Sequence, residues 1–110
     1  MGTPRLQEPS FLILSALADE PRHGYALLEQ VSLLSGGAVT LKVGSLYGAL
    51  DRLAAQGLLV VDREEVVESR LRRYYRLTPR GVEVLTQEAE RLSRQAAAAL
   101  QRLRAGQAPA

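Results

Sequence analysis

Apolar residues recur at helical spacing most clearly between positions 42 and 58 of the chain. Three leucines share one side of the helix that this spacing predicts, namely Leu46, Leu50 and Leu53. Gly44-Ser45 offers a small residue and a hydroxyl for capping the start of the helix, and Gly57 stands where it would end. We therefore expect a helix over residues 44–56 that packs one side into the core.

The opposite side of this helix is shallow. It carries Ser45, Gly48, Arg52 and Ala55, with Tyr47 and Asp51 on one flank. A helix that only has to be soluble more commonly shows Glu and Lys there, whereas this profile suits entry into the major groove of DNA. Glycine in a helix interior costs about 1 kcal/mol relative to alanine, and close approach of the backbone to DNA would offset that cost at Gly48.

Two helical stretches precede this helix. After a loose polar lead over residues 1–7, the first begins at Glu8-Pro9-Ser10 and ends before Pro21. Its apolar residues, Phe11 and Leu14 among them, surround most of the helix, so we expect one side to contact another subunit.

The second predicted helix covers residues 25–34 and is followed by a break at Ser35-Gly36-Gly37. Its expected inner face consists of Leu27, Leu28, Val31 and Leu34. Helix, glycine-bearing turn and helix form the helix-turn-helix pattern, here with a long connector.

The periodicity changes after Gly57. A β-branched run from Leu58 predicts a strand, residues 66–71 predict the hairpin tip, and residues 73–77 predict the returning strand. Alternation turns Tyr75 and Leu77, or else Tyr74, toward the core. Three helices followed by a two-stranded hairpin indicate a winged helix-turn-helix.

A long amphipathic helix completes the chain. Thr78 is the expected N-cap, Pro79 the first helical residue, and the helix runs to about Arg104 before Gly106 and Pro109 stop it. Its apolar positions keep a heptad register: Val82, Leu85, Ala89, Leu92, Ala96, Ala99 and Leu103. A helix of roughly 40 Å at 1.5 Å per residue exceeds what a small domain covers, which favours a dimer interface. Packing against the chain's own first helix is the alternative, and a combination of both is open.

The sequence thus predicts a mainly α fold with a small β-hairpin. Residues 1–77 would form a winged helix-turn-helix domain and residues 78–110 a C-terminal dimerisation helix with a tail, together one structural unit. Self-association would also stabilise so short a chain. The dimer contacts that we expect are Phe11, Leu14, Leu85, Ala89, Leu92, Ala96 and Leu103.

Charge is distributed unevenly although the net charge is only +2. Thirteen of the fourteen basic residues are arginine, and residues 69–81 contain five arginines and no acid. Arginine is suited to bidentate phosphate contact, so residues 70–76 predict a wing that lies on the DNA backbone, with a solvated charge face as the alternative. The candidate DNA contacts from the residues alone are Lys42, Ser45, Tyr47, Gly48, Arg52, Arg72 and Arg73. Arg52 could instead form a surface ion pair, Ser45 a helix cap, and Tyr47 a partly buried ring.

The sequence contains few residues that would suggest a catalytic or metal-binding site. The chain contains no cysteine, and its one histidine, His23, is more typical of a capping or surface residue than of a site. No nucleophile, carboxylate pair or phosphate-binding glycine loop is recognisable. We expect neither an enzyme nor a cofactor or metal. The absence of a leader segment and of a long apolar run favours a cytoplasmic protein without a membrane partner.

Three stretches together resemble PadR-type transcriptional regulators: SFLILSALADEPRHGYALLEQV, VGSLYGALDRLAAQGLL and RRYYRLTPRG. The resemblance covers about residues 10–104 and implies a dimeric winged-helix repressor of the short type, with residues 44–56 as recognition helix. It implies that the strand from Arg72 to Tyr75 belongs to the wing, which adds Tyr75 to the candidate DNA contacts. It also implies that Tyr25 lies near the DNA backbone, although the pattern alone would place Tyr25 in the core. Several relatives release double-stranded DNA on binding phenolic or other small aromatic molecules, but the drug-sandwiching tryptophan of some relatives is absent here.

Two rival functions remain open at this point. The same fold could be a winged-helix module that binds a protein, which predicts only weak and salt-labile DNA binding. It could also be mainly a ligand sensor, for which DNA release would saturate with a specific compound. The basic returning strand favours DNA over the protein partner.

Overall fold

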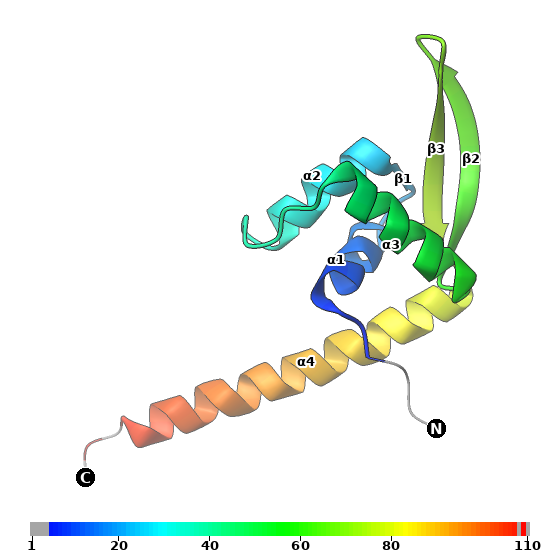
Figure 1. Ribbon diagram of the computed structural model, residues 1–110. Helices are drawn as coiled ribbons and strands as arrows, with labels where there is room; N and C mark the ends of the chain where they lie inside the picture. The colour runs from blue at the N-terminus through cyan, green and yellow to red at the C-terminus, as the bar shows by residue number, and fades with distance from the viewer. Residues whose placement is uncertain (1–4, 108, 110) are drawn as a thin grey trace.

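The computed structural model describes residues 5–107 and 109. Its elements in chain order are α1 (Glu8–Ala16), β1 (Arg22–His23), α2 (Gly24–Leu34), α3 (Val43–Ala55), β2 (Leu59–Val67), β3 (Arg70–Leu77) and α4 (Pro79–Gly106). Figure 1 shows α1 between α4 and the pair α2 and α3, with the β2–β3 hairpin projecting at one end and α4 extending beyond the body. The predicted winged helix-turn-helix is confirmed. None of the helices among the described residues combines the length and apolarity needed to cross a bilayer.

The core forms around α1. Ile13 and Leu14 have no exposed surface, and α1 packs against both α2 and α4. The second buried side that the sequence assigned to a partner subunit is thus covered by α4 of the same chain, and Leu14 belongs to this chain's own core. The other large, fully buried side chains are Leu27, Val31, Leu46, Leu50, Leu58, Leu59 and Val84. Leu34 was expected on the inner face of α2 but is 50% exposed, because α2 ends there and the chain turns away.

The sheet has three strands rather than the two expected. Its order is β1-β3-β2, with all neighbours antiparallel. Strand β1 consists of two residues, with Arg22 opposite Tyr75 and His23 opposite Tyr74. Two residues are too few to show a periodicity in the sequence. This strand is defined only by its pairing with β3.

The hairpin is longer than predicted. Paired residues continue to Val67 and Arg70, so the expected tip at 66–71 shrinks to a two-residue turn at Glu68 and Ser69. Both turn residues have positive φ, 51° and 65°, as in the primed turns whose twist matches antiparallel strands. A bulge between Val61 and Arg63 shifts the register of β2.

Helix α4 begins as predicted. Thr78 is the N-cap, and its Oγ1 accepts a hydrogen bond of 2.9 Å from the Gly81 amide while donating one of 2.6 Å to the Gly57 carbonyl. Glycine is required at position 81, since a Cβ there would collide with the Leu58 carbonyl oxygen. The helix continues through Gly106, two residues past the predicted end.

Only the first half of α4 packs on the domain. Val84 and Glu88 are buried, whereas every described residue of the helix from Leu92 onward is exposed. Of the expected dimer contacts, Phe11 and Leu85 are half-buried and Ala89, Leu92, Ala96 and Leu103 are exposed. The first half of α4 therefore packs on α1 of the same chain, which is the alternative that the sequence left open. The second half presents an uncovered apolar stripe.

Candidate nucleic-acid interface

Helix α3 is anchored by one side and leaves the other side open. Leu46, Leu50 and Leu53 are at most 2% exposed, as the spacing predicted. The helix starts one residue earlier than expected, at Val43, and its N-cap is Lys42 without a side-chain capping bond, so Ser45 is not the cap. Gly57, with φ 76°, ends it as predicted: the amides of Gly57 and Leu58 bond the carbonyls of Ala54 and Leu53.

The outward face of α3 remains as shallow in three dimensions as in the sequence. Ser45 and Arg52 are exposed, Gly48 is half-buried, and a Cβ added at Gly48 would meet only Arg52 Nη1 at 3.9 Å. An open hollow of about 530 Å³ lies beside this face, bordered by Gly44, Ser45, Gly48 and Arg52 together with Pro9 and Leu41. The face is therefore accessible to a large partner.

The connector between α2 and α3 is fixed by Ser35. Its Oγ accepts a 3.0 Å hydrogen bond from the Val39 amide and donates to the Ser32 carbonyl at 3.1 Å. Gly36 and Gly37 take positive φ values, 63° and 84°, which bend the chain directly after α2. This turn sets the position of α3 relative to α2 within the helix-turn-helix.

Tyr47 and Gly24 pack against each other where α3 passes the start of α2. The Tyr47 hydroxyl occupies the space that a Cβ on residue 24 would take, and its ring is 43% exposed. The partly buried ring that the sequence offered for Tyr47 is confirmed, because its hydroxyl end packs against Gly24, and its contact with DNA stays a prediction. Tyr25 is 69% exposed, so the core position that the pattern suggested is wrong, and the position near the DNA backbone that the family resemblance implies stays a prediction.

His23 links the start of α2 to the sheet. Its Nδ1 accepts a hydrogen bond of 3.4 Å from the Ala26 amide, which makes it the N-cap of α2, as the capping interpretation predicted. Its ring also meets the Tyr74 ring edge-on at 5.3 Å between centroids. Burial, and secondarily the positive charge of Arg72, lowers the pKa of His23.

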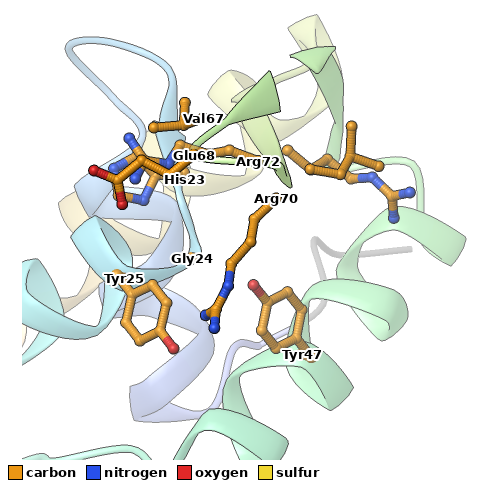
Figure 2. Close-up of a pocket in the computed structure, with 10 residues that line it drawn as sticks. His23, Gly24, Tyr25, Tyr47, Val67, Glu68, Arg70 and Arg72 are labelled. Carbon is orange, nitrogen blue, oxygen red and sulfur yellow. The ribbon is translucent and has the colours of Figure 1, made fainter. Parts of the chain in front are cut away.

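A cavity of about 430 Å³ separates α2, α3 and the wing. It is lined by His23, Tyr25, Tyr47, Arg70, Arg72 and Arg73, among others. Figure 2 shows the rings of Tyr25 and Tyr47 on either side of the opening, with the Arg70 side chain extending toward them. Guanidinium groups and tyrosine hydroxyls are donors that suit anionic oxygens such as phosphate. Sequence reasoning missed Arg70 and His23 as neighbours of this cavity, because only the three-dimensional pairing of β1 with β3 brings them together.

The wing arginines differ in their surroundings. Arg73 lies 3.6 Å from Glu64 and next to the hydroxyl of Tyr75, whereas Arg72 is half-buried beside the cavity. Tyr75 is only 6% exposed, and burial raises the pKa of its hydroxyl. This corrects the expectation of a DNA-contacting side chain at Tyr75, since alternation along β3 turns it into the core.

The remaining candidate contact from the sequence, Lys42, is exposed at the start of α3. The structure thus brings residues of α2, α3 and the wing to one side of the molecule. Within residues 5–107 and 109, no group of three or more His, Asp or Glu side chains is placed to hold a metal ion.

Comparison with protein families agrees with this geometry. The model of the PadR-like family of transcriptional regulators matches residues 13–87. A transcriptional regulator of Mycobacterium tuberculosis is 41% identical over 80 residues, which cover 73% of this chain and 71% of that protein. A protein in a Streptomyces fradiae transposon is 41% identical over 90 residues, or 82% of this chain, but the chain spans only 24% of that relative.

Solved structures share the fold. A PadR family regulator from Clostridium difficile aligns with a TM-score of 0.73 at 25% identity, over 88% of this chain and 99% of that one. Bacillus subtilis PadR, solved in complex with operator DNA, aligns with a TM-score of 0.66 at 21% identity, over 74% of this chain and 46% of that one. The chain belongs to the PadR-like family of transcriptional regulators, and it is a DNA-binding regulator with a winged helix-turn-helix, not an enzyme.

Proposed function

We propose that the protein is a homodimeric repressor that binds a pseudo-palindromic operator in double-stranded DNA. The observation that carries this proposal is the outward face of α3. Its core side is anchored by fully buried leucines, while Gly48 and Ser45 leave the opposite face low enough to enter a major groove. A rigidly seated helix with a shallow outer face meets the geometric requirement for reading base edges.

The contacts in this proposal fall into two classes. Arg52 and Ser45 face the groove, where they can reach base edges or nearby phosphates. Phosphate contacts are assigned to Lys42 at the start of α3 and, around the cavity between α3 and the wing, to Tyr25, Tyr47 and the β3 arginines, Arg72 and Arg73 among them. Bacillus subtilis PadR, which shares the fold, was solved in complex with operator DNA, and this supports DNA as the partner.

Dimerisation in this proposal uses the exposed half of α4. Leu92, Leu100 and Leu103 are 38%, 54% and 59% exposed. An apolar stripe of this kind on a helix that leaves its own domain favours pairing with a second copy. Twofold symmetry would then place two α3 helices on half-sites about one helical turn apart, or a multiple of that spacing.

Hydroxyl-radical footprinting on DNA from upstream of the protein's own gene tests this arrangement. We expect two protected half-sites related by a dyad, about 10 base pairs apart or a multiple of that number. A single protected site without symmetry would contradict the dimeric arrangement, and the absence of protection would contradict operator binding.

The proposal includes release of DNA by a small phenolic or other aromatic effector, which the family resemblance implies. Titration of phenolic acids into the protein–operator complex tests this part separately. Saturable release by one compound, with a midpoint that does not follow ionic strength, would support it. Release that only parallels the added salt would contradict it.

A further inference from the structure

The acidic strand of the wing faces its basic strand. Register places Glu64 opposite Arg73, and Glu64 Oε2 lies 3.6 Å from Arg73 Nη2. Asp62, the residue at the β2 bulge, lies 3.4 Å from Arg76 Nε. Arginines that appear unopposed along the sequence are therefore partly neutralised by the neighbouring strand.

Arg70 and Arg72 are in a different situation. Neither forms an ion pair within the described part of the chain. Arg70 stands opposite Val67, and Arg72 stands opposite Glu65, whose Oε1 is already bonded to Arg63 Nε at 3.0 Å. Both of these arginines line the cavity between α3 and the wing, which Glu68 also borders.

Phosphate would have to compete with Glu64 for Arg73. The two side chains of this pair are 50% and 45% exposed, so a DNA backbone that approached Arg73 would also approach the Glu64 carboxylate. The phosphate and the Glu64 carboxylate are both negative and repel each other. The ion pair between Glu64 and Arg73 must also open before the guanidinium can turn fully to a phosphate. Arg70 and Arg72 have no ion pair that would have to open first, although Glu65 stands opposite Arg72 and Glu68 borders the same cavity.

We propose that Glu64 is a counter-charge that weakens the contact of the wing with DNA, and that Arg70 and Arg72 make a larger contribution to phosphate binding than Arg73. This inference rests on the proposed DNA-binding function. The counter-charge lowers the affinity of the wing for DNA of any sequence. A larger share of the total affinity then comes from contacts between α3 and the bases. The wing thereby limits non-specific binding.

The Glu64→Gln variant tests the counter-charge. Fluorescence anisotropy on operator and scrambled DNA should show affinity increased by up to about fivefold on both, the range of an exposed ion pair, with operator preference unchanged. The salt slope should steepen by about one unit as Arg73 gains a phosphate contact. Adding Arg73→Ala to the Glu64→Gln variant should reverse the gain. Glu90→Gln, which removes the same charge from an exposed position on α4, is the matched control.

Single arginine variants test the ranking. Arg72→Ala should weaken binding to both DNAs and reduce the salt slope by about one unit, and Arg73→Ala should do less. Two results would overturn this inference even if the unsubstituted protein binds its operator. One is equal DNA affinity of Glu64→Gln and Glu90→Gln, and the other is an equal loss of DNA affinity in Arg72→Ala and Arg73→Ala. Failure of the unsubstituted protein to bind DNA would overturn the proposed function and this inference together.

Discussion

The backbone amide of Leu6 donates a 2.8 Å hydrogen bond to Glu88 Oε2, 82 positions further along the chain. The other oxygen of the Glu88 carboxylate accepts a 2.6 Å bond from Arg91 Nε, and Glu88 is only 4% exposed. The sequence suggested a loose lead over residues 1–7. Residues 1–4 lie outside the described part, but Leu6 is tied to α4 and packs against the core. This bond couples the segment before α1 to the helix proposed to form the dimer.

Replacing Glu88 with alanine should lower the free energy of unfolding by about 1–3 kcal/mol, because a buried amide and an arginine lose their shared acceptor. Urea denaturation measures the change, and Glu90→Ala on the exposed side of α4 should stay within about 0.5 kcal/mol of the unsubstituted protein. Equal stability of the two variants would contradict this role of Glu88.

The same site has a defined pH dependence. Hydrogen bonds from Arg91 and from the Leu6 amide lower the pKa of Glu88 below its ordinary value of 4.5. The stabilisation is therefore fully present above pH 4.5 and is lost as the pH falls through the lower folded-state pKa. The stability difference between the unsubstituted protein and Glu88→Ala should narrow only in that acidic range.

Substituting Gly48 with alanine separates folding from DNA binding. A methyl group there meets no close neighbour other than Arg52 Nη1 at 3.9 Å, and alanine is favoured over glycine in a helix by about 1 kcal/mol. The variant should melt at a higher temperature yet bind operator DNA about tenfold more weakly or worse, because the methyl projects from the face that meets the groove. Gly106→Ala, an open position on α4, should gain stability without losing affinity. Unchanged DNA affinity of Gly48→Ala would remove this face from the interface.

His23 should make the fold sensitive to mild acid. Its pKa lies below the ordinary 6.5 through burial and the nearby Arg72, so the unfolded chain takes up a proton more readily than the folded one. Stability should be highest above pH 6.5 and fall as the pH drops from there through the folded-state pKa. His23→Asn retains an N-cap acceptor without a titrating group. Its melting temperature should fall less between pH 7.5 and 5.5 than that of the unsubstituted protein, and parallel curves would contradict the assignment.

Replacing Leu92 with aspartate should convert the proposed dimer to monomers, because a charge in the apolar stripe of α4 would be buried on pairing. Analytical ultracentrifugation gives the oligomeric state. Ala98→Asp provides the control, since residue 98 is about 200° around the helix from Ala96 at 100° per residue. Persistence of dimers in Leu92→Asp, or dissociation in both variants, would contradict the proposed interface.

Local patterns predicted the parts of the fold that depend on local physics. The three leucines of α3, the Thr78-Pro79 start of α4 and the inward turn of Tyr75 all follow from periodicity or capping preferences. Tyr75 is instructive, because alternation offered either Tyr75 or Tyr74 to the core while the family resemblance suggested that Tyr75 contacts DNA. The residue-level pattern was the better guide at that position.

The features that were missed depend on contacts between distant segments. Strand β1 exists only because β3 pairs with it, and the close approach of Gly81 to the Leu58 carbonyl arises only when α4 docks. The carboxylate at position 88 belongs to a polar stretch of sequence, and nothing local distinguishes it from Glu90. The acids of β2 were visible in the sequence, but only the register shows which arginines they oppose.

Operator recognition by α3 is tested most directly by a fluorescence anisotropy titration of the purified protein at several salt concentrations. The two probes are DNA from upstream of its own gene and a scrambled sequence of the same length. We expect a preference of at least about 10³-fold for the native sequence, retained while both affinities fall with salt. Equal and steeply salt-dependent binding to both would show only a basic wing meeting phosphate, and it would contradict the proposed operator recognition by α3.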